Sequence, residues 1–200
     1  MENLEDFFRT FDQRWGGTRD PRIELRVLGS TALMLQSDYI RGTNDGDVLE
    51  TASISGETKE RLLALGGKGS PLHLRHGLYL DVVPNGLPFL PHGPRWHPLP
   101  ALNGSLRVFA VMVLDIVDVV VSKTKRFSAN DQSDVQAMID RDQVPHDRLV
   151  ERFRSAVDVF SGDARAEDLP RYVRNLHRIE RDMLGVGESE IELPGWIDDA

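Results

Sequence analysis

Two carboxylates two residues apart are the first feature of this sequence that could do chemistry. Asp45 and Asp47 stand in the stretch TNDGD, just ahead of an apolar run. Residues i and i+2 of an extended segment project to the same side, so the two carboxylates would repel each other unless a cation lay between them. Oxygen ligands at this spacing suit magnesium, which takes one or two carboxylates and fills its other positions with water and phosphate oxygens. A polar turn is the alternative, because Asn, Asp and Gly are common turn residues.

A third carboxylate, Asp81, lies inside the apolar segment LYLDVV. Burying an unpaired carboxylate in such a strand is costly, so Asp81 should be paired, metal-bound or at the edge of a sheet. A structural ion pair would explain it equally well. A carboxylate on a neighbouring strand, facing Asp45 and Asp47, is the arrangement that a two-metal phosphoryl-transfer site uses.

A Gly-Ser pair, Gly29-Ser30, follows an expected strand and precedes an expected helix. Such a turn leaves backbone N–H groups and the positive end of a helix exposed, which favours phosphate binding. The same pattern also occurs in ordinary turns. The further glycines of the dinucleotide-binding fingerprint are absent here.

Periodicity and turn residues predict strands and helices in the first half of the chain and helices alone in the second. We expect strands over residues 23–29, 47–52, 77–84 and 106–111, and helices over 3–14, 30–36 (with Ser30 as the N-cap), 56–67, 112–125, 129–140, 146–160 and 166–184. The proline-rich stretch 84–105 is expected to be an irregular loop. These elements predict an α+β fold, a small mixed β-sheet flanked by helices with a helical C-terminal part. The domains would be an α/β core over 1–111 and a helical part over 112–200 packed on it.

Composition narrows the classes of partner. The formal net charge of −8 argues against extensive binding to nucleic-acid backbones, although it leaves room for a small charged substrate or the end of an RNA. The absence of cysteine excludes disulfides and thiolate zinc sites and favours a cytoplasmic protein. No apolar run is long enough to span a bilayer, so no membrane partner is expected.

Two groups of motifs resemble a known family. Leu28-Gly29-Ser30, Arg41-x-Thr43-x-Asp45-x-Asp47 and the later Asp81 resemble the DNA polymerase beta-like nucleotidyltransferase superfamily. The form of the second motif is similar to the compact bacterial branch, which includes nucleotidyltransferase toxins of toxin–antitoxin pairs. The segment SKTKRFSANDQSDVQAMI resembles that branch's Lys-x-x-Arg…Asp-x-x-Asp helix pair, through Lys123, Arg126, Asp131 and Asp134. The resemblance covers about residues 23–140, and it implies a nucleotidyltransferase-like core.

The resemblance also implies a role for each matching residue. Gly29 and Ser30 would hold a triphosphate, and Asp45 and Asp47 would ligate magnesium, with two ions expected. Asp81 would act on the acceptor hydroxyl as a metal ligand or a base. Lys123 would neutralise phosphate charge, Arg41 and Thr43 would brace the site, and Arg126 and Asp134 would orient the lysine-bearing helix or contact the nucleotide.

The expected function is therefore magnesium-dependent transfer of an NMP from an NTP to a hydroxyl of an RNA 3′ end, a protein or a small molecule. An antitoxin protein is a further expected partner. The alternative is a non-catalytic nucleotide-binding or partner-binding protein that retains the fold. Gly46 favours that alternative. The family usually has a bulky apolar residue there, and glycine would let the side chains of Asp45 and Asp47 vary in their relative orientation.

Overall fold

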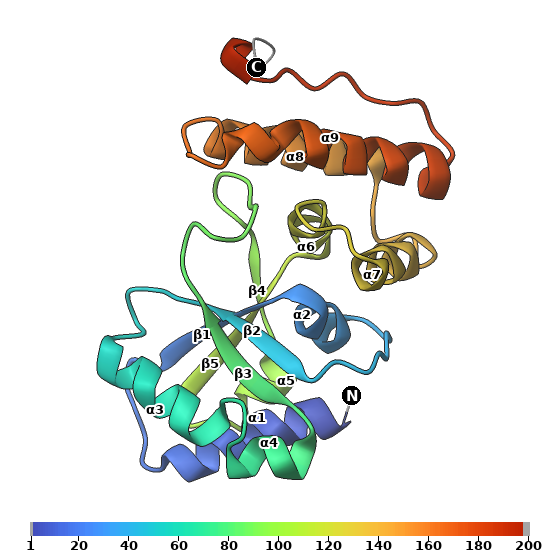
Figure 1. The fold of residues 1–200 in the computed structure, drawn as a ribbon. Helices are drawn as coiled ribbons and strands as arrows, with labels where there is room; N and C mark the ends of the chain where they lie inside the picture. The colour runs from blue at the N-terminus through green and yellow to red at the C-terminus, as the bar shows by residue number, and fades with distance from the viewer. Residues whose placement is uncertain (1, 198–200) are drawn as a thin grey trace. The chain divides into compact units, whose positions relative to one another are not determined.

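The computed structural model describes residues 2–197 (Figure 1). Contacts divide the chain into two compact units, Met1–Leu87 with Trp96–Asp115, and Pro88–Arg95 with Ile116–Ala200. The first unit carries a β-sheet and the second is helical. Each unit is described by itself below.

A five-stranded mixed sheet in the order β3-β2-β1-β5-β4 forms the centre of the first unit. Its strands are β1 (Ile23–Leu28), β2 (Asp45–Leu49), β3 (Tyr79–Val83), β4 (Trp96–Pro98) and β5 (Phe109–Leu114). The pairs β1/β5 and β2/β3 are parallel, whereas β1/β2 and β4/β5 are antiparallel. Buried residues alternate along β1, where Ile23, Leu25 and Val27 all face the core. The sheet therefore places β2 between β1 and β3.

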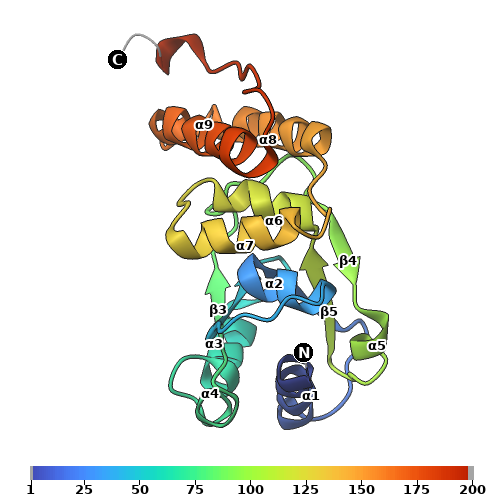
Figure 2. The same cartoon turned by 90° about the vertical axis from the view of Figure 1, so that its right-hand side faces the viewer.

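Helices of the first unit cover this sheet (Figure 2). They are α1 (Glu2–Trp15), α2 (Gly29–Gln36), α3 (Gly56–Gly66), α4 (Pro71–His76) and α5 (Pro100–Asn103). Helix α2 contacts β1, β2 and β5, while α3 contacts β3 and α1 contacts both α3 and α4. The ring of Phe11 on α1 stacks on Phe109 of β5 with 5.0 Å between centroids. Aromatic packing thus joins the first helix to the sheet.

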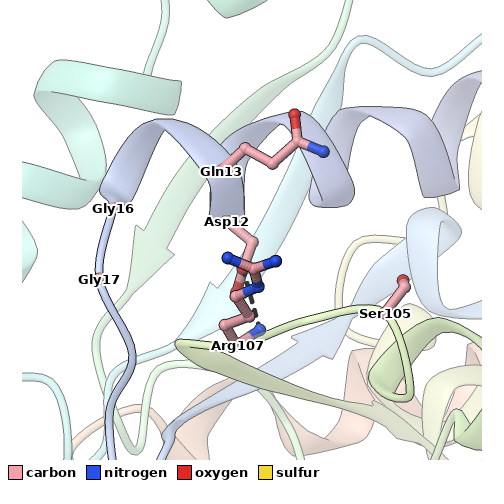
Figure 3. Close-up of a pocket in the computed structure, with 6 residues that line it drawn as sticks. All are labelled: Asp12, Gln13, Gly16, Gly17, Ser105 and Arg107. Carbon is pink, nitrogen blue, oxygen red and sulfur yellow. Dashed lines mark hydrogen bonds between the residues drawn. The ribbon is translucent and has the colours of Figure 1, made fainter.

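A buried carboxylate fixes the start of β5 (Figure 3). Asp12 of α1 accepts hydrogen bonds from the backbone N–H groups of Arg107 (2.9 Å), Val108 (2.9 Å) and Phe109 (3.0 Å). These bonds satisfy the carboxylate and three backbone donors together, so its burial carries little penalty. They also explain why β5 begins at Phe109 rather than at the predicted residue 106.

The second unit contains helices α6 (Ile116–Lys123), α7 (Ala129–Ile139), α8 (His146–Phe160) and α9 (Leu169–Arg178). It also has the 3-10 helices η1 (Ala166–Asp168) and η3 (Gly195–Ile197) and the π-helix η2 (Ile179–Leu184). Asp118 of α6 forms a buried ion pair with Arg152 of α8, with Oδ1 2.6 Å from Nε. The Phe89 ring packs against those of Phe153, Phe160 and Tyr172. These contacts hold the segment 88–95 to the helices.

The predicted α+β fold with a mixed sheet and a helical C-terminal part is confirmed. Several boundaries were wrong. Strand β2 begins at Asp45 rather than residue 47, and α6 begins at Ile116 because β5 extends to Leu114. The stretch 84–105, predicted as a loop, contains β4 and α5, and helix α4 was not predicted. Among the described residues, no helix is long and apolar enough to cross a membrane.

Candidate active site

The register between β2 and β3 brings the three predicted carboxylates together. Asp47 pairs with Asp81, and Asp45 pairs with Tyr79, in the parallel ladder. Because i and i+2 residues of a strand share a face, Asp45 and Asp47 lie side by side on β2, opposite Tyr79 and Asp81 on β3. We call these four residues the carboxylate row.

Asp81 lies on the edge strand β3, and its side chain is exposed. Its Oδ1 atom accepts a hydrogen bond of 2.9 Å from the backbone N–H of Val82. Of the three environments expected for this carboxylate, the structure shows the edge of the sheet. Exposure removes the cost that a buried carboxylate would carry in this apolar segment.

Asp45 is held by two threonines. The Thr43 hydroxyl donates a 2.7 Å hydrogen bond to Asp45 Oδ1, and the Thr31 hydroxyl donates a 2.7 Å bond to the Asp45 carbonyl. The first bond orients the carboxylate and the second ties its backbone to α2. Thr43 thus contacts one residue of the site that it was predicted to brace, while the contribution of Thr31 was not predicted.

Gly29 lies against the carboxylate of Asp47. The glycine has φ +67°, a conformation that L side chains rarely adopt, and a Cβ atom there would lie 2.9 Å from Asp47 Oδ2. The backbone conformation therefore favours glycine, and a side chain there would displace the Asp47 carboxylate. The Gly-Ser turn and the carboxylate row are immediate neighbours.

Ser30 was predicted to be the N-cap of α2, and this was wrong. The helix begins at Gly29, and its N-cap is Leu28, whose side chain makes no capping hydrogen bond. Because Gly29 can take a positive φ, the chain turns one residue earlier than Ser30. The Ser30 hydroxyl instead accepts a 3.0 Å hydrogen bond from a terminal nitrogen of Arg41. Arg41 therefore lies beside the turn.

Gly46 is buried between its two aspartate neighbours. A Cβ atom there would lie 3.2 Å from Leu80 Cδ2 and 3.8 Å from Thr31 Cγ2. Those two side chains occupy the space that a larger residue at position 46 would need. The bonds from Thr31 and Thr43 to Asp45 offset part of the backbone freedom that glycine allows.

Tyr79 lies within the electric field of all three carboxylates. Burial raises the pKa of its phenol, and the negative charges of Asp45, Asp81 and Asp47 raise this pKa further. The sequence analysis did not single out Tyr79. Its position two residues before Asp81, on the same face of one strand, was the available signal.

The donors of the carboxylate row are hard oxygens, the type that magnesium prefers. The described residues contain no group of three or more His, Asp or Glu side chains placed to hold a metal ion together. The row can therefore offer a magnesium ion one or two carboxylates, with water and phosphate oxygens completing the shell. This number of protein ligands is typical of magnesium sites that also bind nucleotide phosphates.

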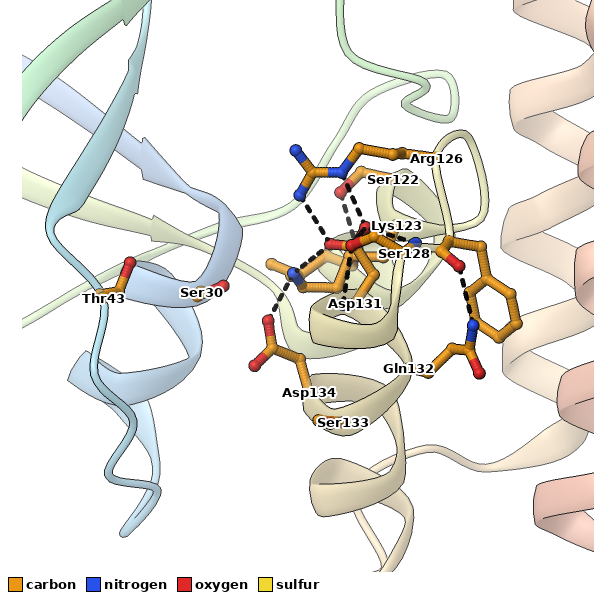
Figure 4. A network of polar contacts seen from close by, with 12 residues as sticks. Ser30, Thr43, Ser122, Lys123, Arg126, Ser128, Asp131, Gln132, Ser133 and Asp134 are labelled. Carbon is orange, nitrogen blue, oxygen red and sulfur yellow. Dashed lines mark hydrogen bonds and ion pairs between the residues drawn. The ribbon is translucent and has the colours of Figure 1, made fainter.

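A second cluster of predicted site residues lies within the helical unit (Figure 4). Lys123 Nζ lies 2.6 Å from Asp134 Oδ2 and 3.1 Å from Asp131 Oδ1. Arg126 donates from Nε to Asp131 Oδ2 at 2.9 Å and from a terminal nitrogen to Asp131 Oδ1 at 3.1 Å. The Lys123 side chain is 6% exposed and that of Arg126 is 75% exposed. Lys123 thus joins the end of α6 to α7, and Arg126 is the solvent-facing cation of the cluster.

Asp131 is the centre of this cluster. Ser128 and Asp131 form a capping box at the start of α7, each side chain bonding to the other residue's backbone. Burial on its own would raise the pKa of the Asp131 carboxyl. Hydrogen bonds from Arg126, Ser128 and Lys123 and the charge of Lys123 outweigh burial and hold this pKa well below its usual range.

The structure thus places the predicted site residues in two groups. Gly29, Ser30, Arg41, Thr43, Asp45, Asp47 and Asp81 belong to the sheet-containing unit, and Lys123, Arg126 and Asp134 to the helical unit. Within each group the side chains or backbones contact one another as described above. Thr31 and Tyr79 join the first group.

A comparison with protein families gives one match over most of the chain. The model of the family described as "Nucleotidyltransferase of unknown function (DUF6036)" matches residues 3–182. No curated protein and no solved structure matches the chain.

Proposed function

The chain belongs to this family of nucleotidyltransferases, and on that premise we propose that it transfers an NMP from an NTP to a hydroxyl acceptor with the help of magnesium. The observation that carries the proposal is the contact between the Gly29 turn and Asp47, with Asp81 in register on the next strand. A phosphate-binding turn beside a row of carboxylates is the arrangement that this chemistry needs.

The first requirement for this reaction is a binding site for the triphosphate of the NTP. Leu28, the N-cap of α2, makes no side-chain capping hydrogen bond, and the N-terminal end of a helix favours negative charge. Ser30 and Arg41 add a hydroxyl and a guanidinium beside this turn. We propose that these groups bind the phosphates of the NTP and direct its α-phosphate toward Asp47.

The second requirement is a set of carboxylates for the metal and the acceptor. Asp45 and Asp47 would hold magnesium, which supplies charge neutralisation at the phosphates when bound. Thr43 keeps Asp45 in one orientation through its hydrogen bond. Asp81 Oδ2 would accept a hydrogen bond from the acceptor hydroxyl, because Oδ1 already accepts one from Val82. Such transfer depends mainly on alignment and charge stabilisation, which fixed side chains provide.

The Lys123 cluster lies within the helical unit. We propose that Arg126 is its phosphate-binding cation, because its guanidinium is exposed and Lys123 is already paired with two carboxylates. The ion pair of Lys123 with Asp134 would then fix α6 against α7, and so position Arg126 in the segment between them. This assignment deviates from the role implied for Lys123 by the family resemblance.

Incubation of the protein with each of four α-labelled NTPs and total cellular RNA and protein tests the proposal. Magnesium-dependent label in a macromolecule would support NMP transfer and would reveal the base and the acceptor. If no NTP labels any acceptor while NTP and magnesium still raise the melting temperature, the chain is a binding protein instead.

The motifs of the first unit also resemble those of toxin–antitoxin nucleotidyltransferases. We therefore propose, as a narrower form of the function, that transfer occurs in the cytoplasm and harms the cell that makes the protein. Growth arrest on expression, relieved by a neighbouring gene and absent for Asp47→Asn, would support this form. Unimpaired growth with active protein would contradict it.

A further inference from the structure

Three side chains with hydrogen-bond donors gather at the β3 side of the carboxylate row: Tyr79 of the row itself, His73 and Lys68. Tyr79 belongs to the row, because it pairs with Asp45 across the ladder and shares a strand face with Asp81. Its ring centroid lies 5.2 Å from that of His73 on α4. Lys68, in the loop after α3, places Nζ over the same ring at 5.9 Å from the centroid. Tyr79 therefore links the carboxylates to a lysine and a histidine.

Each of these three side chains has a hydrogen-bond donor that is available to a ligand. His73 Nδ1 accepts a 3.0 Å hydrogen bond from the backbone N–H of Gly69, so a neutral ring carries its proton on Nε2. No residue among those that the structure describes accepts a hydrogen bond from Tyr79 Oη, Lys68 Nζ or His73 Nε2. Lys68 is also exposed, with no carboxylate in ion-pair range within the described chain.

The position of these donors indicates which substrate they serve. Strand β2 lies between β1 and β3, so the Gly29 turn at the end of β1 is on one flank of Asp47 and Asp81 is on the other. The proposed function assigns the NTP phosphates to the β1 flank. The β3 flank, where Tyr79 lies, is then the side of the acceptor.

We propose that Lys68, His73 and Tyr79 bind a phosphate group of the acceptor, next to the hydroxyl that receives the NMP. A lysine ammonium, an imidazole N–H and a phenol O–H are donors of the kind that phosphate oxygens accept. A phosphate on the acceptor would bring a negative charge to this exposed ammonium. The acceptor that we infer is a nucleotide, either at the end of an RNA or free. This inference rests on the proposed function, which defines the acceptor flank.

Binding without turnover tests the inference. The full-length protein is titrated, in magnesium buffer without NTP, against a 5′-fluorescent RNA hexamer that contains all four bases, and anisotropy is recorded. A second hexamer has an uncharged methylphosphonate at its 3′-terminal linkage. The variants are Lys68→Gln and Tyr79→Phe, and Arg75→Gln is the matched control, because Arg75 is an exposed residue of α4 that makes no hydrogen bond or ring contact with Tyr79.

We expect Lys68→Gln to weaken binding of the natural hexamer about tenfold and Tyr79→Phe about threefold, with Arg75→Gln unchanged. The uncharged linkage should weaken binding by the native protein about tenfold. With this hexamer, Lys68→Gln should bind with the same affinity as the native protein. A mixture of four NMPs is added as a competitor. If the NMPs displace the natural hexamer, or if they bind when neither hexamer does, the acceptor that carries the phosphate is a free nucleotide.

Equal affinity for the charged and uncharged hexamers would overturn the inference, as would a loss in Arg75→Gln as large as that in Lys68→Gln. So would failure of both hexamers and of the NMPs to bind. Because no NTP is present, these results are independent of whether the protein transfers an NMP. A protein that binds the phosphate but labels no acceptor would contradict the proposed function alone.

Discussion

The Oδ2 atom of Asp47 lies 2.9 Å from the point that a Cβ atom on Gly29 would occupy. This contact joins the turn that is proposed to bind phosphate to the carboxylate that is proposed to bind magnesium. The two groups come from consecutive strands, and the antiparallel pairing of Leu28 with Asp47 brings them together. The site is therefore a direct consequence of strand register.

Gly29→Ala should abolish most activity. The substitution strains a backbone with φ +67° and forces the Asp47 carboxylate to move. We expect a loss of about 1–2 kcal/mol in the free energy of unfolding and about a hundredfold loss in transfer rate. Denaturant unfolding and label transfer measure the two effects.

Gly77→Ala is the matched control for this variant. Gly77 has φ +68°, and a Cβ atom there would meet no atom within 4 Å. It should lose similar stability but keep its transfer rate. Equal activities of the two alanine variants would show that the contact with Asp47 is irrelevant to function.

Substitutions at Gly46 should show how tightly this position is packed. Gly46→Ala needs only a small shift of Leu80, whose Cδ2 would be 3.2 Å from the new Cβ. Gly46→Leu should lose about 1–3 kcal/mol of unfolding free energy by overpacking. Combining it with Leu80→Ala should cost less than the sum of the two single changes. Strict additivity, measured by urea unfolding, would mean that the two side chains do not compete for space.

Lys123→Met should destabilise the helical unit strongly. It leaves the buried carboxylates of Asp131 and Asp134 without their shared cation, a change that typically costs about 3–5 kcal/mol. Arg126→Gln should cost less than about 1 kcal/mol, because the guanidinium is 75% exposed and solvent screens it. Guanidinium chloride unfolding of both variants checks this ranking. Similar stabilities would contradict the structural role given to Lys123.

Acid should weaken the same cluster. The pKa of Asp131 is lower in the folded chain than in the unfolded one. Its contribution to stability is therefore complete above the unfolded pKa of about 3.9 and is lost as the pH falls below that value. We expect the free energy of unfolding to fall with pH in this window for the native chain and less steeply for Asp131→Asn. Parallel pH profiles for the two proteins would refute the assignment.

Sequence periodicity predicted the elements that carry a clear repeating pattern of apolar residues, and it failed for elements that depend on pairing with a distant strand. Helix α8 matches the predicted 146–160 because its apolar residues recur at helical spacing over fifteen positions. Strand β2 was placed two residues late, because TNDGD has the composition of a turn and only pairing with β3 extends the strand to Asp45. The three-residue strand β4 is held by its pairing with β5 and carries little signal of its own.

The candidate site was predictable to a similar degree. The i, i+2 spacing pointed to Asp45 and Asp47, and Asp81 stood out because a carboxylate in an apolar segment is unusual. Tyr79 had only its position two residues before Asp81 as a signal, and Lys68 and His73 lie outside the strands, where lysine and histidine are common. Only the register of β2 with β3 and the packing of α4 bring them beside the aspartates.

The transfer rate of Asp47→Asn, measured with the labelled NTP and acceptor that the native protein prefers, is the sharpest test of magnesium binding by this carboxylate. We expect a folded variant with an unchanged melting temperature and no detectable transfer, because a half-exposed carboxylate contributes little to packing but carries the charge that magnesium needs. A folded Asp47→Asn protein that transfers NMP at the native rate would show that this carboxylate is not needed for transfer.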